Sequence, residues 1–223
     1  MNLIIAALAP IALIIIYIYV KDRYEKEPVR LLLYSFLLGA FVSIMITSFL
    51  YTIFDFFIPL DSSIVFQQFI KAFFIVGFTE EFSKYVIVRY YNQPKAAFNE
   101  PFDGIVYAVM VSMGFAATEN IMYVLDGGFQ TALLRMFTAV PAHATFGVLM
   151  GYFIGKAKFS KNKKAKLNLS GLLLAIIFHG AYDFFLFIDF IPGIWIGAFA
   201  SLAIGLILSR KAIKLHQNNS HFK

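Results

Sequence analysis

Long apolar stretches, separated by short polar connections, constrain this 223-residue chain more than any other feature. At 1.5 Å per residue, a helix of about 20 residues crosses the roughly 30 Å hydrocarbon core of a bilayer. The chain is 60% hydrophobic and 14% charged, more apolar than a soluble domain of this length can hide. The runs are continuous, whereas a membrane β-barrel needs short alternating segments. We therefore predict one all-α domain over residues 1–223, a polytopic transmembrane bundle of about seven helices at 3–20, 31–54, 64–88, 104–125, 131–155, 169–187 and 193–208.

The basic residues occur in alternate connections. Sixteen of the 19 Lys and Arg residues lie in four segments, 21–30, 89–103, 156–168 and the tail from 209. The connections between them, 55–63, 126–130 and 188–192, hold none. The positive-inside rule then predicts a chain in the cell membrane with its N-terminus outside and its C-terminus in the cytoplasm. The lysines of 156–168 are expected to orient helices and contact anionic membrane lipid, and no nucleic-acid partner is predicted.

The first apolar stretch is expected to be a retained helix. No positive segment precedes it, and it continues to Val20, past the signal-like Ala7-Leu8-Ala9. The chain has no cysteine, which excludes disulfides and thiolate metal sites. Pro141 falls inside the fifth stretch and predicts a kink there.

The third apolar stretch carries charges at a depth where a simple anchor would carry leucine. Glu80, Glu81 and Lys84 fall within it, and charged side chains cost about 2.5–3.5 kcal/mol each at the centre of a membrane helix. Glu80 and Lys84 are four residues apart and share a helix face, with the acid in the favourable N-terminal position. Glu81 is turned by about 100° from Glu80 and can point elsewhere.

Other apolar stretches carry ionisable residues at similar depth: Glu119, His143, His179 and Asp183. His179 and Asp183 are again four residues apart, which places the imidazole beside the carboxylate. The alternative interpretation is a buried polar cluster that only holds the helices together. Its hydrogen bonds would each stabilise the bundle by about 0.6–2 kcal/mol, which is less than the cost of burying so many charges. The set is therefore interpreted as functional.

Two further pairs of residues in these stretches receive structural interpretations. Ser112 and Ala116 share a face with Glu119 and would let another helix approach closely. Lys71 and Arg135 lie near the predicted outer ends of their helices, from which they are expected to snorkel to the interface.

Carboxylates beside histidines can activate water, either as general bases or by holding a metal whose bound water has a lowered pKa. The sequence has no G-x-S-x-G elbow and no H-E-x-x-H helix. A proton-coupled transporter remains an alternative, because Asp, Glu and His chains also relay protons. No pair of corresponding broken helices marks an inverted repeat, which counts against it.

An ordered set of motifs resembles the PrsW family of bacterial intramembrane proteases. The set comprises Glu80-Glu81-x-x-Lys84, Glu100-Pro-Phe-Asp-Gly-Ile-Val-Tyr107, Phe115-x-x-x-Glu119-Asn120, Pro141-Ala-His143 and His179-x-x-x-Asp183. The resemblance implies site-1 cleavage of a single-pass anti-sigma factor, which frees a sigma factor in a stress response. On this basis we expect catalytic roles for Glu80, Glu81, Glu119, His179 and Asp183, and supporting roles for Lys84, His143 and Asn120.

The PrsW family is in turn distantly similar to the CAAX prenyl endopeptidases, in which a Glu-Glu motif activates water with help from two histidines. This chain departs from that pattern, because its second motif ends in Glu119 where those relatives have histidine. His143 could supply the missing imidazole. Alternatively, a divalent metal such as zinc could be held by oxygen and nitrogen ligands from Glu119, His143, His179 and Asp183.

The resemblance implies cleavage near the outer face, whereas the predicted helix ends place Glu80 and Glu81 in the inner half of the bilayer. Both can hold only if water reaches the site. We therefore expect a water-filled cavity that opens outward past Glu119 and Asp183. Residues 126–130 are expected at its rim.

Overall fold

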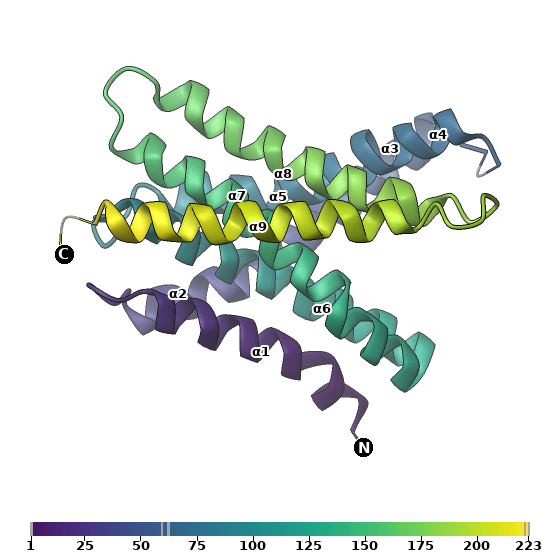
Figure 1. Cartoon of the computed structure of the whole chain (residues 1–223), viewed down its shortest axis with the longest axis horizontal. Helices are drawn as coiled ribbons and strands as arrows, with labels where there is room; N and C mark the ends of the chain where they lie inside the picture. The colour runs from purple at the N-terminus through teal and green to yellow at the C-terminus, as the bar shows by residue number, and fades with distance from the viewer. Residues whose placement is uncertain (1, 59, 62, 221, 223) are drawn as a thin grey trace.

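The computed structural model describes residues 2–58, 60, 61, 63–220 and 222, and the regular structure within this part of the chain is entirely helical (Figure 1). Three π-helical stretches (η) lie between α-helices. The elements are α1 (Leu3–Lys21), α2 (Val29–Leu37), η1 (Leu38–Ser43), α3 (Ile44–Phe57), α4 (Val65–Ile70), η2 (Lys71–Gly77), α5 (Phe78–Ile87), η3 (Val88–Asn92), α6 (Pro101–Phe137), α7 (Ala139–Lys158), α8 (Lys164–Phe187) and α9 (Ile196–Asn218).

Five stretches of the described chain are long and apolar enough to cross a membrane: 3–21, 29–57, 103–158, 164–187 and 196–218. The third of these contains both α6 and α7. The predicted helix at 64–88 is present as α4, η2, α5 and η3, but its glutamates and lysines keep it out of this set. The chain is thus an all-helical, multi-pass membrane protein, as the apolar runs predict.

Helix α6 lies at the centre of the bundle and is buried along most of its N-terminal half. Glycines let α7 approach it closely. A Cβ added at Gly155 would lie 2.0 Å from the carbonyl oxygen of Pro101, and one added at Gly151 would lie 2.3 Å from that of Gly104. Without side chains at these positions the two backbones come into contact, which is how small residues stabilise helix pairs in membranes.

The opposite side of α6 packs against α2 and η1 by the same means. A Cβ at Gly114 would lie 1.9 Å from the carbonyl oxygen of Phe36, and one at Gly39 would lie 2.1 Å from that of Val111. The predicted close approach at Ser112 is also confirmed, because Gly147 of α7 faces its hydroxyl. Helix α6 is therefore fixed in position between two closely packed neighbours.

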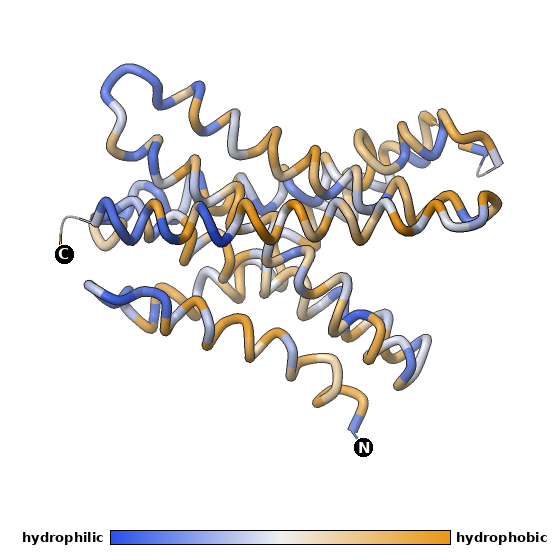
Figure 2. The backbone as a smooth tube through the Cα atoms, viewed as in Figure 1, coloured by the Kyte–Doolittle hydropathy of each residue, from blue (hydrophilic) through white to orange (hydrophobic). Residues whose placement is uncertain are grey.

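The helices end in two groups of connections that differ in polarity. We call the end that holds 22–28, 93–100, 159–163 and the C-terminus the basic end; hydrophilic residues gather there in Figure 2. The opposite end holds the α3–α4 and α8–α9 connections (Figure 1). The alternation predicted from sequence thus corresponds to a physical segregation of charge.

The fifth predicted helix is divided differently in the structure. Residues 131–137 belong to the C-terminal part of α6, which continues after a break at Gly128, where φ is +71°. Helix α7 begins only at Ala139. Pro141 consequently lies in the first turn of α7 and not in mid-helix, so it interrupts no hydrogen bond and the expected kink is not needed.

Candidate active site

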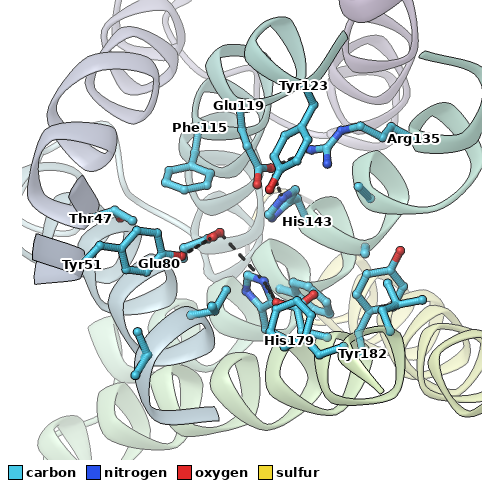
Figure 3. A pocket seen from close by; sticks show the side chains of 18 of the residues that line it. Thr47, Tyr51, Glu80, Phe115, Glu119, Tyr123, Arg135, His143, His179 and Tyr182 are labelled. Atoms are coloured by element: carbon cyan, nitrogen blue, oxygen red, sulfur yellow. Dashed lines mark hydrogen bonds and ion pairs between the residues drawn. The ribbon is translucent and has the colours of Figure 1, made fainter. Parts of the chain in front are cut away.

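The ionisable side chains predicted to form a site come together between α5, α6, α7 and α8 (Figure 3). The π-helical stretch η2 directly precedes Glu80 and Glu81, and such stretches occur frequently at functional sites. One carboxylate oxygen of Glu80 and of Glu81 and one ring nitrogen of His143 and of His179 all lie within 4.8 Å of one another. All four residues are buried.

Lys84 supplies a cation to this cluster. Its Nζ lies 2.7 Å from Oε1 of Glu81 and 3.4 Å from Oε2 of Glu80, which confirms the pairing expected for residues four apart. It also lies 3.3 Å from Nδ1 of His143 and over the ring of Phe115. An ammonium group only donates hydrogen bonds, so Nδ1 of His143 must accept. His143 is thereby fixed as the tautomer with hydrogen on Nε2.

Glu119 accepts the hydrogen bond that this Nε2–H group donates, and its Oε2 lies 2.8 Å from Nε2 of His143. The same oxygen accepts a bond of 2.8 Å from Arg135, whose Nε also donates to Asn120 Oδ1 at 2.6 Å. Asn120 donates in turn to the backbone oxygen of Ala7 at 2.7 Å, which ties α1 to the site. Arg135 therefore turns into the site, and the expectation that it snorkels to the interface is wrong.

His179 connects the two glutamates to α8. Its Nδ1 lies 2.8 Å from Oε1 of Glu81, and its Nε2 lies 3.2 Å from Oδ2 of Asp183, the contact predicted from their spacing. Oε2 of Glu80 is more distant, at 3.9 Å from Nε2. The ring stacks on Phe146 with 4.8 Å between centroids, which fixes its plane. Lys84 and His179 therefore both hold Oε1 of Glu81.

Glu80 has a different environment. It lines a pocket of about 690 Å³ that Glu81 does not line. Tyr51, on α3, donates a hydrogen bond of 2.9 Å to Oε1 of Glu80. Sequence reasoning missed Tyr51, and no local signal separates it from the other tyrosines. The pocket makes Glu80, of the two adjacent glutamates, the one that can contact water or a substrate.

The pocket runs from this cluster toward the end of the bundle that lies opposite the basic end. Its lining includes Glu119, Asp183 and His143, and it reaches Asp55 and Lys71 near the α3–α4 connection. Lys71 is exposed, lies over the ring of Phe187 and lines the outer part of the pocket, and its expected snorkelling to the interface stays a prediction. Residues 126–130 are not among those that line it.

The donor set fits a divalent metal ion, with different ligands from the four expected. The grouped donors come from Glu80, Glu81, His143 and His179, and Oε2 of Glu81 is buried without a hydrogen-bond partner. Glu119 and Asp183 contact the outer ring nitrogens of the histidines, the position in which carboxylates commonly orient metal-binding imidazoles. The Lys84 ammonium makes three of the contacts that such an ion would take over.

Comparisons with known proteins give matches to one family over most of the chain. Residues 27–209 match the model of the PrsW family intramembrane metalloproteases. The chain is 37% identical to Protease PrsW of Geobacillus kaustophilus (strain HTA426) over 89% of its own length and 85% of that protein. It is also 37% identical to Protease PrsW of Bacillus subtilis (strain 168) over 81% of each chain, and 32% identical to that of Clostridioides difficile (strain 630) over 85% and 81%.

No solved structure gives a significant match to this chain. Family membership therefore rests on sequence. The breadth and number of the matches leave no basis for the transporter alternative, and they identify the chain as a peptidase with a protein substrate. The chain belongs to the PrsW family of intramembrane metalloproteases.

Proposed function

We propose that the chain hydrolyses a peptide bond within the membrane, with Glu80 as the general base. The observation that carries this proposal is that Glu80 lines the pocket while Glu81 is enclosed by Lys84 and His179. Glu80 would take a proton from water as the oxygen attacks the scissile carbonyl carbon. It would return that proton to the amine nitrogen as the C–N bond breaks, so that no other reactant is consumed.

The remaining residues position this reaction. Glu81 would hold Lys84 and His179 in place through the contacts described above. Tyr51 would orient the carboxylate of Glu80. Glu119 and Asp183 would fix the two imidazoles, and Asn120 would anchor Arg135. The sequence-predicted set of five catalytic residues would then divide into one base, Glu80, and four residues that position the groups around it.

A divalent metal such as zinc would be held by Glu81, His143 and His179, which leaves Glu80 free to act as the base. Bound there, the metal would lower the pKa of a water and polarise the carbonyl. The buried, unpaired Oε2 of Glu81 and the inward-facing Nδ1 of His143 support such binding. In either case the protein residues exclude bulk water from one side of the site, since Glu81 is fully buried.

We propose that the substrate is a membrane-spanning anti-sigma factor, cut at site 1 so that a sigma factor is released. The relatives' name, Protease PrsW, supports this only through the family resemblance. The whole chain would act as one peptidase domain with seven membrane-crossing segments, the basic end in the cytoplasm and the N-terminus outside. In that orientation the pocket opens toward the outer face, because it reaches the α3–α4 end.

The decisive experiment compares Glu80→Gln and Glu81→Gln, purified in detergent, on an anti-sigma-factor transmembrane peptide. Glu80→Gln should lower kcat by at least about a hundredfold, because general-base catalysis contributes roughly 10²–10⁴-fold. Asp189→Asn, an exposed carboxylate in the α8–α9 connection, is the matched control and should cleave normally. Wild-type rates in both glutamine variants would overturn the proposal. Loss only in Glu81→Gln would transfer the base role to Glu81.

The orientation is tested separately in this cysteine-free chain. Cysteines at Met122 and Phe187, which line the pocket, should react with a membrane-impermeant thiol reagent added outside intact cells. A cysteine at Asn162, an exposed position toward the basic end, should react only after the membrane is permeabilised. The reverse pattern would invert the proposed topology.

A further inference from the structure

A second group of carboxylates lies at the basic end, where the α1–α2 connection meets the start of α6. One carboxylate oxygen from each of Glu25, Glu27 and Asp103 lies within 4.8 Å of the others. None of the three lines the pocket of the active site. They come from segments separated by more than 70 residues, so the fold and not local spacing brings them together.

Two of these side chains are buried without the partners that burial normally requires. Glu27 is 2% exposed, and its carboxylate faces that of Asp103, with no N–H or hydroxyl donor bonded to either of its oxygens. Asp103 is fully buried; its Oδ2 accepts from the backbone N–H groups of Asn99 and Glu100 at 2.7 and 2.8 Å, while Oδ1 has no partner. Nearly all buried polar groups are paired, so unpaired oxygens facing one another point to a missing partner.

The neighbouring cation does not supply that partner. The ammonium group of Lys26 bonds to the backbone oxygens of Tyr19 and Asp22 and to none of the three carboxylates. Among the described residues, no ion pair includes Glu25, Glu27 or Asp103. Burial, and then the Asp103 carboxylate, raises the pKa of Glu27 to about 10. Protons or a bound cation must therefore balance this charge.

We propose that Glu25, Glu27 and Asp103 bind a divalent cation of the Ca²⁺ and Mg²⁺ class, which joins the α1–α2 connection to α6. The donors are all oxygens, which these hard cations prefer, and nitrogen or sulfur donors typical of zinc are absent from the group. Oxygens up to 4.8 Å apart suit a Ca²⁺ ion at about 2.4 Å from each. Glu25, which is half-buried, leaves room for water on the accessible side.

The test uses the full chain in detergent with Mn²⁺ as an EPR-visible probe, in a His179→Ala background that removes a ligand of the other cluster. This variant should bind one Mn²⁺ that Ca²⁺ or Mg²⁺ displaces. Adding Glu27→Gln should weaken binding at least about tenfold, whereas adding Asp189→Asn, an exposed carboxylate elsewhere, should not. Glu25→Gln, at a half-buried position that tolerates change, provides a second variant if Glu27→Gln fails to fold.

Thermal unfolding gives an independent measurement. At 100 times its dissociation constant, a bound ion should raise the melting temperature of the His179→Ala chain by about 5 °C or more. Adding Glu27→Gln should abolish that increment, while the chelated double variant should melt no lower than the chelated His179→Ala chain, since a buried charge has been removed. Two results would overturn the proposal and leave protons as the balancing charge. One is no Mn²⁺ binding in the His179→Ala background, and the other is equal binding when Glu27→Gln or Asp189→Asn is added to it.

Discussion

The ion pair between Arg135 and Glu119 gives the sharpest test of the site, because the sequence predicts that Arg135 points the other way. The guanidinium lies 2.8 Å from Oε2 of Glu119, and the two side chains are 13% and 20% exposed. At that separation and an effective dielectric constant of about 20, the attraction is about 6 kcal/mol before desolvation. Desolvation and residual exposure reduce this, so we expect a coupling energy of about 2 kcal/mol, typical of charge-assisted hydrogen bonds.

A double-mutant cycle measures this coupling. Arg135→Met keeps a long side chain but removes the guanidinium, which lies over the ring of Tyr123, and leaves Glu119 paired only with His143. It should cost about 2–4 kcal/mol in the free energy of unfolding. Glu119→Gln should cost a similar amount, and the double variant about 2 kcal/mol less than their sum. Unfolding is followed by far-UV circular dichroism in mixed detergent micelles.

Arg135→Met combined with Asp189→Asn provides the control, since these sites share no contact and should be additive within about 0.5 kcal/mol. A coupling energy for Arg135 and Glu119 no larger than that of the control pair would refute the geometry. It would mean that Arg135 reaches the membrane interface, as its position near the end of an apolar run first suggests.

Three other substitutions probe separate parts of the molecule. Gly114→Ala should lower the free energy of unfolding by about 1–3 kcal/mol, because the new Cβ would lie 1.9 Å from the Phe36 carbonyl oxygen; an unchanged unfolding midpoint would contradict this packing. Tyr51→Phe should lower kcat roughly 5- to 100-fold with little change in KM, through loss of the hydrogen bond to Glu80; a normal kcat would exclude an orienting role. Lys84→Met should raise zinc affinity at least about tenfold in a chelator competition assay, because it removes the ammonium that occupies the donor cluster; an unchanged affinity would place the metal elsewhere.

The parts of the site that follow helical periodicity could be predicted from the sequence. Glu80 and Lys84, like His179 and Asp183, are four residues apart on one helix, and both pairs are in contact. Their geometry depends only on 3.6 residues per turn, which any helix provides. The apolar runs likewise located the helices, because the bilayer requires long continuous apolar segments.

The direction of Arg135 could not be predicted in the same way. Its distance from Glu119 depends on the break in α6 at Gly128, after which the chain turns back toward the site. The sequence carries a signal for this break in Gly127-Gly128, since paired glycines mark turns. Counting residues from this turn does not predict the direction of the Arg135 side chain, because that direction depends on how the surrounding helices pack.

Tyr51 illustrates a second limit. It is one of 12 tyrosines, and its role depends on the packing of α3 against α5, which brings a residue 29 positions away to Glu80. The expected metal ligands show the same difficulty, because residue types alone do not distinguish a donor facing the ion from one that orients a histidine. Only the contacts of His143 and His179 place Glu119 and Asp183 in the outer position.

The pocket explains how a membrane can accommodate this concentration of charge. Carboxylates deep in a bilayer need water, partners or both. Of the two adjacent glutamates, Glu81 is held by charged partners, whereas Glu80 faces the pocket. Glu81 is fully buried, with Lys84 and His179 both bonded to its Oε1, and does not line the pocket. Glu80 lines a space of about 690 Å³, enough for roughly twenty water molecules at about 30 Å³ each. A substrate helix that filled this space would displace most of that water and leave Glu80 beside the peptide bond. Hydration would thus stabilise the resting site, and its loss on substrate binding would strengthen the electrostatic interactions on which hydrolysis depends.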